Sequence, residues 1–307
     1  MGSAVIQQTC GQIGYNSRPM SLHYDLHSHS LASDGTLSPS ELVQYASTAG
    51  VDVLALTDHD DTSGLREASE AARINGLHLI PGVEISVTWN KQTVHVVGLR
   101  IDPESSPLLQ GLEKSREFRN WRAEEIGRRL AKHGIEGAFA AASRLAKGRI
   151  ISRTHFAQFL SNEGHAKSVR DVFKHFLKPR KPGYVPGEWA TLEEALGWIH
   201  SAGGQAVIAH PARYTMTASK RRKLFGEFVE LGGEGLEVVS GSHSRGDCLA
   251  MAQYAKQFGL LASSGSDYHG PENPWIALGR LPPLPKSCQP IWSGWGLEVT
   301  GPAQNAD

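Results

Sequence analysis

The 307-residue sequence is poor in cysteine and has no long apolar run. Its cysteines, Cys10, Cys248 and Cys288, are odd in number, far apart and without a CxxC pair. This argues against a disulfide framework or a zinc finger and is typical of a reducing cytosol, so we expect a cytoplasmic protein. No apolar stretch approaches the ~20 residues that span a bilayer, and residues 1–20 do not resemble a signal peptide. We therefore expect no membrane association, and nothing indicates an obligate protein partner.

The sequence also lacks net charge, but its charges are unevenly distributed. Residues 114–181 hold 17 Lys and Arg against 6 Asp and Glu, a net charge of +11, which leaves −11 on the remainder. These cations could simply be the solvated faces of helices. We favour instead a basic cap that attracts a polyanionic substrate, because the acidic remainder carries the candidate metal ligands.

Strands and helices alternate at both ends of the sequence. Short apolar runs of strand length lie at residues 22–27, 51–57, 77–80, 83–89, 93–99, 206–209, 235–239 and 261–264. Asn90-Lys91 predicts a hairpin turn, and Ser38 with Glu41 forms a capping-box pattern at the start of a helix. Thr62 or Ser63 could cap the next helix, which we expect to end near Gly76. This alternation predicts an α/β fold with a parallel, barrel-like sheet.

Helical patterns dominate the middle of the chain, at residues 108–133, 153–162 and 169–177, and a further helix is expected at 192–202. We interpret residues 103–190 as a basic helical domain that is inserted into the barrel. The barrel itself would comprise residues 22–102 and 191–285. Residues 1–21 are expected to be a leader, and residues 286–307 an irregular C-terminal tail.

Nine His, Asp and Glu residues carry the chemical signal of this sequence. Most of them lie just past the predicted carboxyl end of a strand, where loops of a β/α barrel converge on one site. A single His at such a place is more often a surface residue than a ligand, but nine on separate strands are unlike a chance pattern. The candidate metal ligands are His27, His29, Asp34, His59, Glu84, His95, His210, Asp267 and His269.

This ligand set suits hard-to-borderline ions such as Mn²⁺, Zn²⁺ or Fe²⁺, and no thiolate lies nearby. Six of the nine residues are imidazoles and three are carboxylates. With three divalent ions and one bound hydroxide, the site would keep a charge of about +2, which a phosphate dianion balances. We therefore prefer phosphoester hydrolysis to amide hydrolysis.

Short motifs in a fixed order resemble those of the polymerase-and-histidinol-phosphatase (PHP) superfamily. They are Asp25-Leu26-His27-Ser28-His29, Ser33-Asp34-Gly35, Leu56-Thr57-Asp58-His59, Gly82-Val83-Glu84, Val94-His95, Ala209-His210-Pro211 and Gly265-Ser266-Asp267-Tyr268-His269. The resemblance spans about residues 22–270. It implies a distorted seven-stranded β/α barrel with two or three metal ions.

Three further motifs resemble the branch of this family that contains nucleoside 3′,5′-bisphosphate phosphatases and 5′-to-3′ exoribonucleases. They are residues 151–156, 181–185 and 241–244. The branch implies removal of a phosphate from a nucleoside 3′,5′-bisphosphate to leave the 5′-monophosphate, or trimming of short 5′-phosphorylated RNA, by attack of a metal-bound hydroxide. The expected partner is thus a nucleotide or a short RNA.

The resemblance also implies how the residues divide their work. Three divalent ions, with Mn²⁺ expected and Zn²⁺, Fe²⁺ or Mg²⁺ as alternatives, would be held by His27, His29, Glu84 and Asp267; by Glu84, His95 and His210; and by Asp34, His59 and His269. The residues expected to act in catalysis are His27, His29, Glu84, Asp267 and His269.

Substrate contacts are expected from the basic segment and from loops near the metals. Arg153, Lys181 and Arg213 are candidates for phosphate binding, because Arg offers a planar fork and Lys a point charge. Each could instead be an ordinary surface cation. His155 and Tyr184 are expected to flank the site.

Two other functions stay open on the sequence. A histidinol-phosphate phosphatase would share the metal ligands, but a small substrate that carries its own cations gains little from a cap of +11. A non-catalytic, metal-stabilised domain would be expected to have lost ligand positions, and none of the nine is lost.

Overall fold

Residues 22–146 and 150–297 are described by the structure, a computed structural model, and they contain a seven-stranded sheet with the strand order β1 to β7. The strands are β1 (Tyr24–Asp25), β2 (Val53–Leu56), β3 (His78–Trp89), β4 (Gln92–Leu99), β5 (Gln205–Ile208), β6 (Gly235–Ser240) and β7 (Leu261–Gly265). Backbone hydrogen bonds from Leu26 to Ser264 and from Asp267 to His27 connect the first strand with the last. The sheet thus nearly closes, and the predicted α/β barrel is confirmed.

The sheet is mixed rather than parallel throughout. β4 runs antiparallel to both β3 and β5, whereas the other neighbours are parallel. Asn90 and Lys91 join β3 to β4 with φ of 46° and 62°. Positive φ at both positions is typical of a two-residue type I′ hairpin turn, so the predicted hairpin is confirmed. The predicted parallel sheet is thus interrupted at β4, which runs antiparallel to both of its neighbours.

The two strands expected at residues 77–80 and 83–89 form the single strand β3. Pro81 pairs with Leu56 of β2, and Gly82 pairs with Leu99 of β4. The strand therefore changes partners at Pro81-Gly82 instead of ending there. A proline, which cannot donate a ladder hydrogen bond, is tolerated at such a place.

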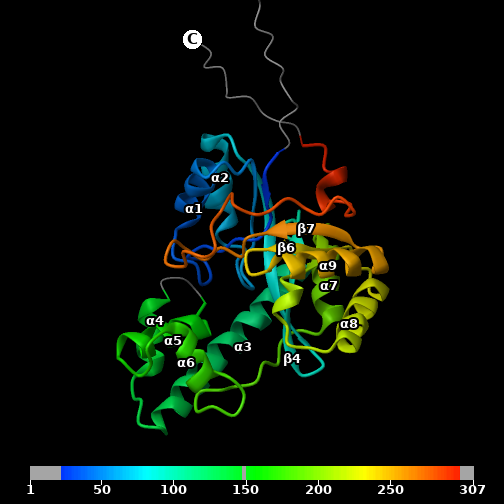
Figure 1. The fold of residues 1–307 in the computed structure, drawn as a ribbon. Coiled ribbons are helices and arrows are strands. Elements are labelled where there is room, and N and C mark those ends of the chain that lie inside the picture. The colour runs from blue at the N-terminus through cyan, green and yellow to red at the C-terminus, as the bar shows by residue number, and fades with distance from the viewer. Residues whose placement is uncertain (1–21, 147–149, 298–307) are drawn as a thin grey trace, which may run out of the picture.

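Helices cover the outside of the barrel, α1 and α2 on one side and α7, α8 and α9 on the other (Figure 1). They are α1 (Pro39–Thr48), α2 (Leu65–Asn75), α7 (Leu192–Ser201), α8 (Ala218–Glu230) and α9 (Arg245–Phe258), with short 3₁₀ turns η2 (Pro211–Arg213) and η3 (Ile291–Gly294). The capping box of Ser38 and Glu41 is confirmed, as is the end of α2 at Gly76. The predicted cap of α2 is wrong, because Gly64 caps it and the Ser63 N–H donates to Asp61 instead.

A second group of helices lies beside one end of the barrel and is called the cap below (green in Figure 1). It contains α3 (Ser106–Ala131), α4 (Ala138–Leu145), α5 (Arg153–Asn162), α6 (Val169–Val172) and the π-helical turn η1 (Phe173–Leu177). The helix expected at 169–177 is thus α-helical only in its first part, and α4 was not expected. Leu108 of α3 packs in the barrel core, whereas Ile126 and Leu130 of the same helix pack in a separate cap core.

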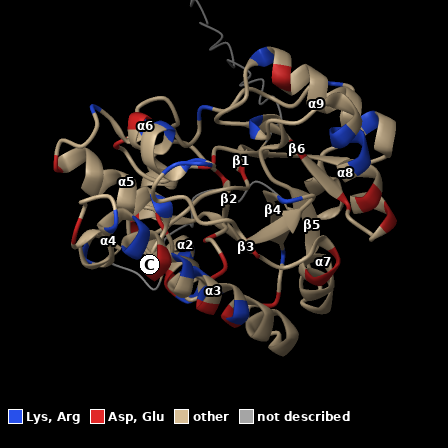
Figure 2. Ribbon diagram, turned by 90° about the horizontal axis from the view of Figure 1, so that it is seen from below, with Lys and Arg blue, Asp and Glu red and all other residues tan. Residues whose placement is uncertain are grey.

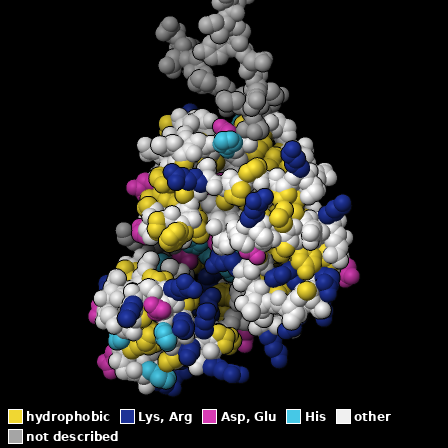
Figure 3. Space-filling view, in the orientation of Figure 1, with side chains coloured by type: hydrophobic (Ala, Val, Ile, Leu, Met, Phe, Trp, Pro, Cys, Tyr) yellow, Lys and Arg dark blue, Asp and Glu magenta, His cyan; other side chains and the backbone are white. Residues whose placement is uncertain are grey.

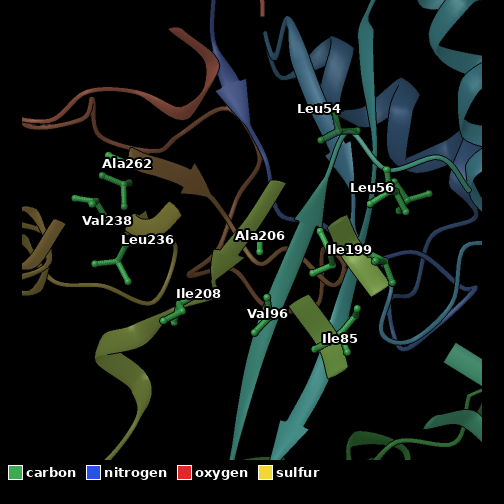
Figure 4. Close-up of a cluster of buried hydrophobic side chains, with 14 of the residues drawn as sticks. Leu54, Leu56, Ile85, Val96, Ile199, Ala206, Ile208, Leu236, Val238 and Ala262 are labelled. Carbon is green, nitrogen blue, oxygen red and sulfur yellow. The ribbon is translucent and has the colours of Figure 1, made fainter. Parts of the chain in front are cut away.

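The barrel core consists of aliphatic side chains from neighbouring strands and from α7. Leu54, Ile85, Val96, Ile208 and Leu236 are all at most 1% exposed, and Figure 4 shows them along adjacent strands. Alternate residues of these strands face this core, which leaves the residues at the strand ends free to face the mouth of the barrel.

Residues near the end of the described chain close the barrel end away from the cap (Figure 1). Trp292 stacks on Tyr24 with ring centroids 4.2 Å apart, and Ile291 is 2% exposed. The predicted leader, residues 1–21, and residues 298–307 of the predicted tail lie outside the described residues. Within the described ranges, no helix is long and apolar enough to cross a membrane.

Candidate active site

All nine predicted metal ligands converge at the mouth of the barrel. His27 and His29 follow β1, His59 follows β2, and His210 follows β5. An isolated bridge between His59 and Glu84 brings the ends of β2 and β3 together. Ligand atoms within 4.8 Å of one another form three groups: His29, Asp34, His59 and His269; His27, Glu84, His210 and Asp267; and His59, Glu84 and His95.

These groups differ from the division that the family resemblance implied. His29 falls in a group with Asp34, and His210 falls in a group with His27 and Asp267. His29 is nevertheless close to His27, with 3.1 Å between their Nε2 atoms, while its ring stacks on that of His269 at 4.2 Å. The ligand atoms are thus close enough together for one residue to belong to more than one group.

Glu84 is at the centre of this cluster and is fully buried. Its Oε1 lies 2.8 Å from His95 Nδ1 and 3.0 Å from His210 Nε2. Its Oε2 lies 2.9 Å from His59 Nδ1 and 3.3 Å from the Nε2 atoms of both His27 and His29. One carboxylate therefore contacts five imidazoles. A carboxylate in this position could be shared between metal ions.

The remaining carboxylates lie at the two edges of the cluster. Asp267 Oδ1 is 3.3 Å from His29 Nε2 and 3.5 Å from His27 Nε2. Asp34 Oδ1 is 3.3 Å from His269 Nε2 and 3.9 Å from His59 Nε2. Every imidazole of the set therefore has a carboxylate within 4 Å.

The donor atoms fit divalent metal ions. Among the described residues, Asp34 Oδ1 and His210 Nδ1 are buried without a hydrogen-bond partner, and Glu84 Oε2 and His59 Nδ1 lie 2.9 Å apart without forming a hydrogen bond. Buried polar atoms are rarely left so, and imidazole with carboxylate is a ligand chemistry that Mn²⁺, Zn²⁺ and Fe²⁺ accept. A cation among these atoms would satisfy several of them at once.

The electrostatics of the cluster support the same conclusion. Burial opposes a charge on His29, but hydrogen bonds to Asp267 and Glu84 outweigh it and raise the pKa of His29 to about 10. Burial also raises the pKa of Glu84, but the charges of His59 and other imidazoles outweigh it and hold this pKa well below its usual range. The buried carboxylates are thus stabilised by positive charge beside them, which a divalent cation would also supply.

Glu237 supports the cluster from behind and was not found from the sequence. It is 2% exposed; its Oε1 lies 2.9 Å from His27 Nδ1, and its Oε2 accepts a 2.5 Å hydrogen bond from the His210 backbone N–H. A carboxylate behind a ligand imidazole fixes the ring orientation and its tautomer. The available signal was a lone charged residue inside the otherwise apolar strand β6.

A cavity of about 180 Å³ opens directly from the metal cluster toward the cap. Asp34, His59, His95, His210, Asp267 and His269 form one side of it. The opposite side is cationic and aromatic, formed by Arg119, Arg122, Arg153, Phe173 and Trp189, and Arg213 lies beside Asp267 on the cluster side. Figure 3 shows Lys and Arg side chains of the cap along the hollow between the cap and the barrel.

Helix α5 points its N-terminus into this cavity. Ser152, Arg153 and Thr154 all line the wall, and the Ser152 side chain caps the helix by accepting from the Thr154 N–H. Unpaired backbone N–H groups and the helix dipole favour an anion at such an end. The cavity thus combines a dipole with arginine side chains.

The arginines repel one another in this space. Burial, with the charges of Arg153 and Arg119, lowers the pKa of Arg122 to about 9. Burial likewise lowers the pKa of Arg153. Arg213 differs, because the charge of Asp267, with which it forms a close ion pair, raises its pKa. An anion bound between these groups would relieve their repulsion.

Two of the five predicted substrate residues line the cavity, Arg153 and Arg213. Lys181 is exposed on the turn after η1, and Tyr184 lies on the segment that follows. His155 is buried, and its Nδ1 accepts from the Ser152 N–H, so it helps to shape the start of α5. None of these three is among the residues that line the cavity.

One wall of the cavity is formed by Arg119, Arg122 and Trp189. These residues were not among the substrate contacts predicted from the sequence. The Arg119 guanidinium is 4.8 Å from the Trp189 ring centre, and that of Arg122 is 5.4 Å away. Arg119 also donates to Asp60, the residue after His59, at 2.6 Å. The spacing of these arginines by three along α3 was the signal that they share one face of the helix.

Comparison with known proteins assigns this barrel and its site to a family. The PHP domain profile matches residues 25–200. A relative 47% identical over 280 residues covers 91% of this chain. The chain therefore belongs to the PHP domain family, and the resemblance indicated by the motifs is confirmed.

Two relatives and one solved structure are similar to this chain over most of its length. The 47% identical relative, of which 98% is covered, is a 3′,5′-nucleoside bisphosphate phosphatase from Chromobacterium violaceum. The 5′-3′ exoribonuclease Rnm of Escherichia coli is 45% identical over 89% of this chain and 93% of its own. A solved structure of an amidohydrolase from Chromobacterium violaceum, with bound sulfate and no metal, has a TM-score of 0.84 and 48% identity over 87% of this chain and 94% of its own.

Proposed function

We propose that this protein is a metal-dependent phosphoesterase that acts on nucleotides. It removes phosphate from nucleoside 3′,5′-bisphosphates to leave the 5′-monophosphate, or trims short 5′-phosphorylated RNA from its 5′ end. The main observation behind this proposal is that the His and carboxylate cluster lines the same cavity as four arginines. Relatives that are 47% and 45% identical and are named for these two activities support it.

The nine residues at the barrel mouth would hold the metal ions, with three Mn²⁺ ions as the proposed set. When bound, the ions supply Lewis-acid activation of a water and charge to balance the phosphoryl group. His27, His29 and Glu84 are buried and hold the centre, whereas Asp267 and His269 also face the cavity and would contact the reacting group. Glu237 keeps His27 in its orientation.

Phosphate binding falls to arginines on both sides of the cavity. Arg153 and the N-terminus of α5 offer charged and backbone N–H donors to one anion, and Arg213 offers donors next to Asp267. A nucleoside bisphosphate carries two anionic groups, which this arrangement can bind at separate places. Trp189, which lines the cavity near the guanidinium groups of Arg119 and Arg122, offers an aromatic surface for the base.

We also propose that two domains of the chain have separate roles. Residues 22–102 and 191–285 form the metal-binding barrel, and residues 103–190 form the cap that carries most of the cations. Figure 2 shows Lys and Arg on the cap helices, α3 among them, and also on α8 of the barrel. A cytoplasmic location remains a prediction from the cysteine pattern.

Histidinol phosphate is a poorer substrate for this cavity. It would bring its own positive charge into a space already lined by four arginines. A purely structural metal domain is disfavoured as well, because a buried metal site that only stabilised the fold would not need Asp34 and Asp267 to face an arginine-lined cavity.

The test is a turnover panel on one purified sample with Mn²⁺. Adenosine 3′,5′-bisphosphate, a 5′-phosphorylated RNA dinucleotide and histidinol phosphate would be compared by kcat/KM. We expect turnover of one or both nucleotide substrates and little of the third. Preferred hydrolysis of histidinol phosphate, or no hydrolysis of any of them by metal-loaded protein, would overturn the proposal.

A further inference from the structure

The edge of the cavity on the cap side is formed by an irregular helix. α6 continues without a break into the π-helical turn η1, and the first residue of that turn, Phe173, lines the cavity. The guanidinium of Arg153 lies 5.7 Å from the Phe173 ring centre. π-Helical turns are rare and frequently occur at functional sites.

Exposed cations surround Phe173 on the outer side of this edge. Arg170 precedes it by three residues, about one helical turn, and Lys174 follows it directly; both are exposed. Some exposed cations on other helices have an acidic partner on the same helix: Arg73 pairs with Glu70, and Arg128 pairs with Glu125. Among the described residues no acidic group lies within 4 Å of the Arg170 or Lys174 side chain, and the nearby Asp171 hydrogen-bonds to Ser168.

Unpaired cations next to an aromatic ring suggest a ligand that presents phosphates and flat rings in turn. Single-stranded nucleic acid does so, and its binding sites combine a basic track with aromatic side chains. The cavity itself already has arginines for the phosphates of one nucleotide, so Arg170 and Lys174 lie where a longer chain would leave it. More cations, Lys178, Arg180 and Lys181, are exposed along the same segment.

We propose that α6 and η1 form a second-nucleotide subsite for a short single-stranded polynucleotide. Phe173 is the platform for a base at the cavity edge, and Arg170 and Lys174 bind the phosphate that follows. The proposal rests on the nucleotide phosphoesterase function proposed above and assigns residues to the binding of an RNA substrate beyond its first nucleotide.

The main test is the double variant Arg170→Ala/Lys174→Ala, with Lys220→Ala/Arg222→Ala on α8 as a matched control. We would measure kcat/KM with Mn²⁺ on adenosine 3′,5′-bisphosphate and on a 5′-phosphorylated RNA tetranucleotide. We expect about a 10-fold loss or more on the tetranucleotide and less than about 3-fold on the bisphosphate. The slope of log kcat/KM against log salt should fall by about 1.4 for the tetranucleotide, or about 0.7 for each lost phosphate contact.

A second variant tests the base platform by binding rather than turnover. Phe173→Leu keeps an apolar side chain but removes the ring. Fluorescence anisotropy of a 3′-labelled, 5′-phosphorylated tetranucleotide, without added metal, should report a Kd weakened by about 5- to 100-fold. A DNA tetranucleotide run in parallel should lose affinity by a similar factor, because neither contact involves the 2′-hydroxyl.

Several results would overturn the subsite. If kcat/KM fell equally on both substrates, Arg170 and Lys174 would either bind the first phosphate or stabilise the cap. If kcat/KM on the tetranucleotide did not fall, they would be ordinary surface cations. If wild-type protein hydrolysed no phosphoester, the proposed function would fail, but anisotropy would still test the subsite. Unchanged affinity in both variants would then reject it independently.

Discussion

The mouth of the barrel and the facing wall of the cap are both rich in charge, but the charges are arranged in opposite ways. At the barrel mouth every imidazole lies within 4 Å of a carboxylate, and most of the side chains are buried. On the cap wall, Arg119, Arg122 and Arg153 lie close enough to repel one another. The first arrangement suits metal ions and the second suits an anionic substrate, so chemistry and recognition are separated between the two regions.

Helix α3 of the cap contacts the barrel mouth directly. Arg119 and Arg116 of this helix donate to the side chain and to the backbone carbonyl of Asp60, beside His59. The cap is thereby connected to the residues that flank the metal cluster, and substrate that binds the arginines is brought beside it. If the two regions act separately, a substitution in the metal cluster should reduce metal binding, and a substitution in the cap wall should reduce only substrate binding.

The largest effect is expected for Glu84→Gln. This change leaves the shape but removes the charge that five imidazoles share, so kcat should fall by at least about 10²- to 10³-fold. Metal content, measured by mass spectrometry, should fall with it. Glu193→Gln, at an exposed position of α7, is the control and should behave as wild type. Normal turnover with a full metal complement would remove Glu84 from the centre.

Arg153→Ala tests the cap side without touching the metal ligands. Loss of a charged hydrogen bond costs about 1.5–3 kcal/mol, or roughly 10- to 150-fold in kcat/KM. The loss should be larger for a nucleoside bisphosphate than for an aryl phosphate, because only the former has a remote phosphate whose binding positions the scissile bond. Raising the salt should weaken only the bisphosphate reaction. Equal losses for both substrates would place Arg153 at the reacting phosphate instead.

Glu237→Gln tests the support behind the barrel mouth. The amide would still fill the space beside His27, but it would not stabilise the same tautomer, so metal affinity should fall by about 10- to 100-fold. Isothermal titration with Mn²⁺ measures this. The KM for substrate at saturating metal should stay near the wild-type value, since Glu237 is not among the residues that line the cavity. Unchanged metal affinity would reduce Glu237 to a packing role.

The smallest effect is expected for Thr191→Ala, outside both regions. Thr191 caps α7 through a hydrogen bond with the Glu194 N–H, so its loss should lower the free energy of unfolding by about 1 kcal/mol. Urea unfolding measures the change. A kcat/KM that stays within about 2-fold of wild type would show that stability and chemistry are separable here, whereas a large loss of activity would connect α7 to the site.

The sequence predicted the fold well where local signals were strong. Ser38 with Glu41, Asn90-Lys91 and Gly76 each specify a cap or a turn by their own chemistry, and all three were confirmed. The prediction failed where the conformation of a segment depends on pairing with strands that are distant in the sequence. Pro81-Gly82 looks like a chain break, but pairing with β2 and then β4 keeps the segment extended.

The site shows the same limit. His27 and His29 were identifiable because their spacing and position at a strand end are local features. Glu237 was missed, since its function depends on His27, which is 210 residues away in the chain. Lys181 was expected to bind phosphate, but the turn after η1 leaves it exposed and away from the cavity wall. Whether a cation faces a cavity depends on packing that the sequence alone does not reveal.

The central claim is that the His and carboxylate cluster holds the metal ions on which hydrolysis depends. Its most direct test is to remove metal with a chelator, add back Mn²⁺ in steps, and follow bound metal and the hydrolysis of adenosine 3′,5′-bisphosphate on the same sample. We predict that activity disappears with the metal and returns as the cluster fills. Full activity in excess chelator, with metal analysis showing no bound ion, would contradict the account.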